Sequence, residues 1–139
     1  MTEFVSQIKT LPYNEEDVYA MLSDLSNMER VKDKIPADKV QDIAFDRDSC
    51  SFSINPVGKV KFSIVDREPC KTVKFTADDS PVEVSLWIQL KQTGEKDTKM
   101  KVTVKADLNM FMKPMLSKPL QDGVDKIADV LAGIQYDSI

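Results

Sequence analysis

The chain has 139 residues with a formal net charge of −4, and its 42% hydrophobic and 30% charged residues are typical of one folded domain, residues 1–139. The acidic balance argues against a general nucleic-acid binder and a polybasic membrane tether, so we expect no nucleic-acid partner. The chain has no His and two Cys without CxxC spacing, so we expect no His-dependent catalysis, no metal and no cofactor.

The N-terminal region predicts one strand and then helix. It carries two acids before its first Lys and has no long apolar run, so we expect no signal peptide, transit peptide or membrane span, and a cytoplasmic protein. Residues 3–11 predict a strand, which Pro12 ends because proline lacks the amide hydrogen that a strand ladder needs. Asn14 is a good helix N-cap ahead of apolar residues at helical spacing. Ser26 and Glu29 resemble a capping box that opens a second short helix.

Between Val40 and Leu108 the apolar residues alternate with polar ones, which predicts six consecutive strands with one apolar face. With the first strand they make a seven-stranded antiparallel sheet. Requiring paired residues to point to the same side predicts the following pairings: Phe45 with Cys50, Ile54 with Val60, Ile64 with Val73, and Leu90 with Met100.

Trp87 falls on the polar side of its strand, because Leu86 and Ile88 mark the apolar side. Two interpretations remain open. The ring lies half-covered on neighbouring strands or a Lys stem, or it anchors an interface with a second copy or another partner through the outer face of the sheet.

The C-terminal segment predicts one long amphipathic helix from Met110 to Ile134, with Asn109 as its N-cap and a bend near Pro119. Its apolar stripe consists of Met112, Leu116, Leu120, Val124, Ile127, Val130, Leu131 and Ile134. A helix with one apolar stripe must bury it, and the apolar face of the sheet is the surface available. The fold class is therefore α+β.

This order of elements resembles the helix-grip fold of the SRPBCC superfamily, also called START-like or polyketide-cyclase-like. The resemblance covers nearly the whole chain and rests on three segments: LPYNEEDVYAMLSDLSNMERV, SFSINPVGKVKFSIVDREPCKTVKFTA and MFMKPMLSKPLQDGVDKIADVLAGI. It implies a curved sheet wrapped around the long helix, two short helices after the first strand, and a cavity between sheet and helix. The usual role in that family is binding of a small apolar or amphipathic molecule, and some members are enzymes.

We expect the cavity walls to come from the middle of the inward strand faces and the N-terminal half of the long helix. The nominated residues are Phe52, Phe62, Phe75, Leu86, Val104, Met112, Met115 and Leu116, with Tyr13 and Tyr19 at the mouth. A filled core explains the same residues. A ligand cavity predicts a volume of at least ~300 Å³.

The inward faces that we predict carry no Asp, Glu, Lys or Arg, which favours binding of a small apolar or amphipathic molecule without catalysis. Two alternatives remain open. One is a cyclase, aromatase or hydratase-type enzyme, and the other is a protein-interaction module with a vestigial cavity.

Overall fold

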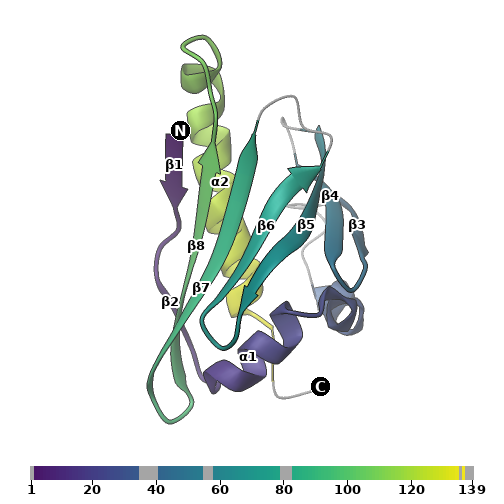
Figure 1. Ribbon diagram of the computed structural model, residues 1–139, viewed down its shortest axis with the longest axis vertical. Coiled ribbons are helices and arrows are strands. Elements are labelled where there is room, and N and C mark those ends of the chain that lie inside the picture. Colours follow the sequence, from purple (N-terminus) through teal and green to yellow (C-terminus); the bar gives the residue numbers. More distant parts are fainter. Residues whose placement is uncertain (1, 35–40, 55–57, 79–82, 135, 137–139) are drawn as a thin grey trace.

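A computed structural model describes residues 2–34, 41–54, 58–78, 83–134 and 136. Within these residues an antiparallel sheet of eight strands runs in the order β1-β8-β7-β6-β5-β4-β3, and β2 also pairs with β8 (Figure 1). The strands are β1 (Thr2–Val5), β2 (Lys9–Leu11), β3 (Gln41–Phe45), β4 (Ser49–Ile54), β5 (Gly58–Glu68), β6 (Thr72–Asp78), β7 (Val84–Gly94) and β8 (Asp97–Ala106). The helices are α1 (Glu15–Leu22), the 3₁₀ helix η1 (Leu25–Lys34) and α2 (Met112–Ala132). The predicted helix-grip α+β fold is confirmed.

The predicted first strand is two strands, β1 and β2, which both pair with β8. Val5 pairs with Thr103, but Lys9 pairs with Met100, so the first segment holds one residue more than β8 between these pairs. Ser6 accommodates the break, because its amide donates to the Val102 carbonyl and its hydroxyl accepts from the Val102 amide. The sheet therefore has eight strands where the sequence predicts seven.

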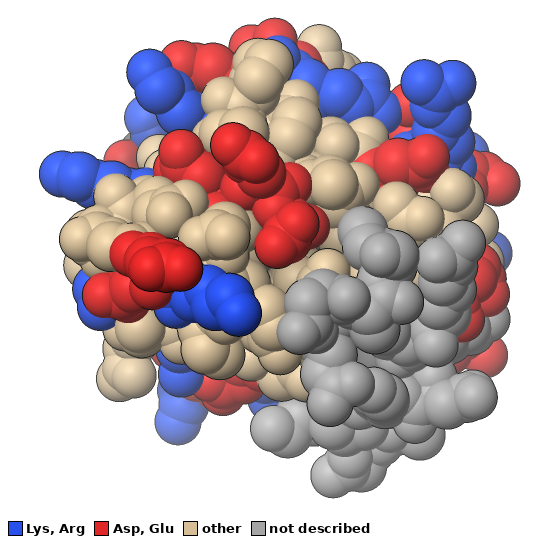
Figure 2. Space-filling view, turned by 90° about the horizontal axis from the view of Figure 1, so that it is seen from below, with Lys and Arg blue, Asp and Glu red and all other residues tan. Residues whose placement is uncertain are grey.

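Helix α1 begins after Asn14, as predicted, but the Asn14 side chain does not cap it. Its Oδ1 instead accepts from the Lys96 amide and the Gln92 side chain, which ties α1 to the β7–β8 hairpin. The first turn carries Glu15, Glu16 and Asp17, which favour the positive end of the helix. Figure 2 looks at the end of the molecule where α1 lies and shows acidic side chains gathered there.

The short second helix is η1, a 3₁₀ helix, and the predicted capping box at its start is wrong. Asp24 makes the local bonds, because its carboxylate accepts from the amide and the hydroxyl of Ser26. Glu29 accepts from the Phe45 amide and so connects η1 to β3. The pKa of the Asp24 carboxyl is lowered, chiefly by the hydrogen bond from the Ser26 side chain.

Two of the four predicted pairings are confirmed, Phe45 with Cys50 and Leu90 with Met100. The other two are wrong by two residues: Ile54 pairs with Gly58, and Ile64 pairs with Phe75. After Ile64 the register of β5 against β6 shifts again, because Asp66 pairs with Lys74. Val65 is the extra residue of this bulge, and its side chain is exposed.

The outward position of Trp87 is confirmed. It pairs with Lys74 on one side and Thr103 on the other, and its ring is half-buried. The ammonium groups of Lys74 and Lys105 lie 5.2 and 5.5 Å from the ring centroid, a distance at which cation–π attraction operates. A homodimer at this face stays a prediction.

Helix α2 packs against β8, β1 and β2 on the concave side of the sheet (Figure 1). It begins at Met112, two residues later than predicted, and continues through Pro119. The predicted bend there stays a prediction. The Asn109 carboxamide accepts from the amides of Phe111 and Met112, so it closes the turn that leads into the helix. No helix in the described part of the chain is long and apolar enough to cross a bilayer.

Candidate functional site

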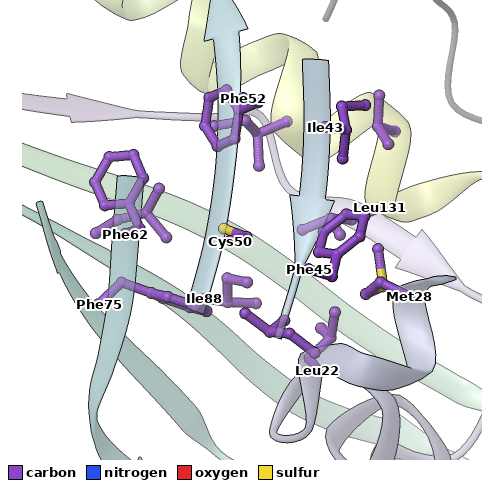
Figure 3. A pocket seen from close by; sticks show the side chains of 14 residues that line it. Leu22, Met28, Ile43, Phe45, Cys50, Phe52, Phe62, Phe75, Ile88 and Leu131 are labelled. Atoms are coloured by element: carbon purple, nitrogen blue, oxygen red, sulfur yellow. The ribbon is translucent and has the colours of Figure 1, made fainter. Parts of the chain in front are cut away.

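A pocket lies between the concave face of the sheet, α1, η1 and the C-terminal half of α2 (Figure 3). Its position follows from the placement of α2. The helix covers the β1, β2 and β8 side of the sheet, so a space remains toward β3, β4 and β5. The lining residues are Leu22, Leu25, Met28, Ile43, Phe45, Cys50, Phe52, Phe62, Phe75, Leu86, Ile88, Ile127, Val130 and Leu131.

The pocket has a volume of about 100 Å³. The expectation of at least ~300 Å³ is therefore wrong for this structure. Large side chains fill much of the space. The rings of Phe52 and Phe62 stack with their centroids 6.0 Å apart, and Phe62 and Phe75 are buried. The remaining volume is smaller than a dry cavity of about 150 Å³ that accepts benzene, so it is at most of the size of one aromatic ring.

The Cys50 thiol is the one titratable group among the described residues that line the pocket. Cys50 comes from β4, opposite Phe62 of β5. Burial raises the pKa of the Cys50 thiol to about 12, and a hydrogen bond with the Phe62 backbone opposes this rise. The thiol is therefore neutral at ordinary pH. Among the described lining residues there is no carboxylate, ammonium, guanidinium or hydroxyl group.

Four of the ten nominated residues line the pocket: Phe52, Phe62, Phe75 and Leu86. Val104, Met112 and Leu116 are not among the lining residues, although Val104 is buried. Met115 is 72% exposed. This pocket is lined by the C-terminal half of α2 and not by the nominated half, whose first turns lie at the far end of the molecule.

The two tyrosines do not line the pocket either. Tyr13 packs edge-on against the buried ring of Tyr136, with 5.6 Å between centroids. Tyr19 is half-buried and lies near Arg67 and Cys70, and burial raises the pKa of its phenol while Arg67 lowers it. That any of the ten residues contacts a ligand stays a prediction.

Sequence reasoning missed the lining residues that come from the helices. Leu22, Leu25 and Met28 lie at helical spacing in α1 and η1, and Ile127, Val130 and Leu131 belong to the predicted apolar stripe of α2. Ile43 and Phe45 alternate with polar or small residues in the sequence, and both line the pocket. The spacing of apolar residues predicts the correct faces of the helices and strands. It does not predict which part of each apolar face borders the pocket.

Comparisons with known proteins agree on the architecture. The norcoclaurine synthase of Thalictrum flavum, solved with dopamine and hydroxybenzaldehyde, is 16% identical, with a TM-score of 0.68 over 94% of this chain and 85% of its own. The Thermus thermophilus protein TTHA0849 is 17% identical, with a TM-score of 0.68 over 94% of both chains. A START superfamily protein from Mycobacterium smegmatis is 9% identical, with a TM-score of 0.63 over 94% of both chains.

The chain has the same helix-grip fold as these solved structures, one of which is a START superfamily protein. No family model matches the sequence, and no curated protein matches it. At these identities the similarity shows the fold alone. In this helix-grip protein the described residues contain no group of three or more side chains that could together hold a metal ion.

Proposed function

We propose that this helix-grip protein binds a small, neutral, apolar molecule in the pocket and catalyses no reaction on it. The observation that carries the proposal is the lining. Every described residue in it presents hydrocarbon, except for the neutral thiol of Cys50 and the thioether of Met28. Such a surface stabilises apolar atoms that leave water, but it offers no partner to a charged or strongly hydrogen-bonding group.

The volume of the pocket limits the ligand to about one ring or a short alkyl chain, unless the pocket widens on binding. A structural neighbour, norcoclaurine synthase, has been solved with dopamine and hydroxybenzaldehyde, which are both single-ring compounds. This supports a ligand of that size. The neighbour is an enzyme, but acid–base catalysis needs a titratable group within reach of the substrate. The described lining supplies a thiol whose raised pKa makes it a poor nucleophile.

The proposal is tested by titration with fluorobenzene, followed by fluorine NMR and by the shift in melting temperature. Ile127→Phe fills the pocket from α2 and should weaken binding by about tenfold or more. Leu116→Phe is the matched control, because Leu116 is also a half-buried apolar residue of α2 but does not line the pocket. It should bind like the wild type.

Three results would contradict the proposal. Absence of saturable binding by the wild type, or equal loss in both variants, would mean that the pocket is not the site. Conversion of a single-ring amine and aldehyde by the wild type, lost in Ile127→Phe, would show binding with catalysis.

We also propose a cytoplasmic location, which the two free cysteines, Cys50 and Cys70, support.

A further inference from the structure

The start of α2 exposes three large apolar side chains close together in the sequence. Met110 is 89% exposed, Phe111 is 84% exposed and Met115 is 72% exposed. In Figure 1 the connection from β8 and the first turn of α2 stand beyond the ends of the neighbouring strands. Soluble monomers rarely expose apolar side chains in such groups without a binding role. We call residues 110–118 the apolar tip.

The apolar tip has a fixed conformation. The Asn109 carboxamide accepts from the Phe111 amide at 3.0 Å and from the Met112 amide at 2.8 Å, and the Lys113 amide donates to the Asn109 carbonyl at 3.0 Å. Phe111 precedes the first residue of α2 but has helical backbone angles, φ −81° and ψ −38°, so it lies on the same side as Met115 four residues later. That side faces solvent, since both are exposed. The exposed Phe111 ring and the two exposed thioethers thus extend from a hydrogen-bonded turn.

The charges of the apolar tip are positive. From Leu108 to Gln121 the ionisable residues are Lys113 and Lys118, and both are exposed. The first turn of α2 carries no acid. Farther along the helix the residues opposite the apolar stripe turn acidic, at Asp122, Asp125 and Asp129. The end of the molecule in Figure 2, where acidic side chains gather, is the opposite end from the tip.

We propose that the apolar tip inserts into the interface of an anionic lipid bilayer. Helix segments that combine Phe or Met with Lys bury their apolar side chains at the boundary between headgroups and acyl chains, while Lys binds the lipid phosphates. A bilayer accepts a projecting tip of any shape, whereas a protein partner must offer a matching groove. A symmetric contact with a second copy would bring the lysines of both tips together. The tip is remote from the pocket, so this inference does not depend on the proposed ligand.

The test is flotation of the full chain with phosphatidylcholine vesicles that contain or lack phosphatidylserine. The wild type should float with the anionic vesicles. Phe111→Ser combined with Met115→Ser should reduce the partition coefficient by about tenfold or more, because it removes the inserting groups. Val65→Ser is the control: it removes an apolar side chain, 54% exposed, from the bulge of β5, and it should leave binding unchanged.

A second double variant tests whether the two lysines contribute to vesicle binding. Lys113→Gln combined with Lys118→Gln should weaken binding to anionic vesicles by about fivefold for each lysine, and binding to neutral vesicles much less. Failure of the wild type to float with anionic vesicles would refute the proposal, and so would an equal loss in Val65→Ser. A wild-type dimer that the serine pair dissociates, seen by sedimentation velocity, would show a contact between copies instead.

Discussion

Tyr136 is a buried residue of the core, and its substitution tests how much its hydroxyl and its ring each contribute to stability. The side chain is fully buried, its hydroxyl donates to the Leu131 carbonyl at 2.6 Å, and its ring packs edge-on against Tyr13. The substitution Tyr136→Phe keeps the ring and removes the hydrogen bond. The Leu131 carbonyl keeps a second donor, because it also accepts from the Ile134 amide at 3.4 Å.

The cost at neutral pH should therefore be that of one hydrogen bond without an orphaned acceptor, about 1 kcal/mol of unfolding free energy. Tyr136→Ala also removes the ring, and the cavity it leaves should raise the cost to about 3–5 kcal/mol. The ratio of these two losses separates the contribution of the hydroxyl from that of the packing.

The two proteins should also respond differently to high pH. Burial, with a smaller contribution from Tyr13, raises the pKa of the Tyr136 phenol above its ordinary value. The unfolded chain then loses this proton at a lower pH than the folded chain. The stability that the neutral phenol contributes is present below about pH 10, and it falls by about 1.4 kcal/mol per pH unit above it. The Phe variant lacks this loss, while the other titrating groups affect both proteins alike.

Urea unfolding of the wild type and Tyr136→Phe, followed by circular dichroism across this pH range, measures the difference. The wild type should be more stable at neutral pH, and the two should become equal near pH ~11, where the linkage loss offsets the hydrogen bond. A stability difference that stays constant from neutral to pH ~11 would refute the reasoning. So would a loss in Tyr136→Ala no larger than that in Tyr136→Phe.

Four further substitutions test the helix and the outer face. Val124→Asp places an unpaired charge at a buried position of α2 and should lower the unfolding free energy by several kcal/mol. Asp125→Ala should lower it by well under about 1 kcal/mol. Equal losses in urea unfolding would mean that α2 docks by another face. Gly123→Ala should stabilise by about 0.5–1 kcal/mol, because a Cβ there meets no atom within 4 Å and alanine favours the helix; a fall in melting temperature would contradict this. Trp87→Ala should dissociate a homodimer if the outer face forms one, and a wild type that sediments as a monomer at micromolar concentration would remove that prediction.

The sequence predicts the faces of this fold better than its registers. Alternation places Phe75, Leu86 and Val102 inward, and all three are buried. The pairings of β4 with β5 and of β5 with β6 are wrong by two residues, because alternation is unchanged by a shift of two. Cys70, in the turn between β5 and β6, has a φ of 61°, which few residues other than glycine adopt and which the sequence did not reveal.

The sequence predicts an apolar pocket between sheet and helix, but the pocket borders the C-terminal half of α2 and not the predicted half. The stripe of α2 indicates which side of the helix is apolar, yet Leu131 borders the pocket and Met112 does not. That difference depends on where the helix crosses the sheet and on how η1 and β3 approach it. Both are long-range contacts, and no local period contains them. The exposure of Phe111 is the same kind of fact, since it depends on where the neighbouring strands end.

The pairing of β1 and β2 with β8 also affects how the chain folds during its synthesis. Thr2 pairs with Ala106 and Leu11 pairs with Thr98, so β1 and β2 find their partner strand only after the residues between them and β8 have been synthesised. At a synthesis rate of about 5–20 residues per second, that interval is several seconds to tens of seconds. During it, buried groups such as Phe4 and Leu11 lack their native cover. Contacts so distant in sequence slow folding, so the nascent N-terminal segment is where chaperone binding or misassembly should concentrate.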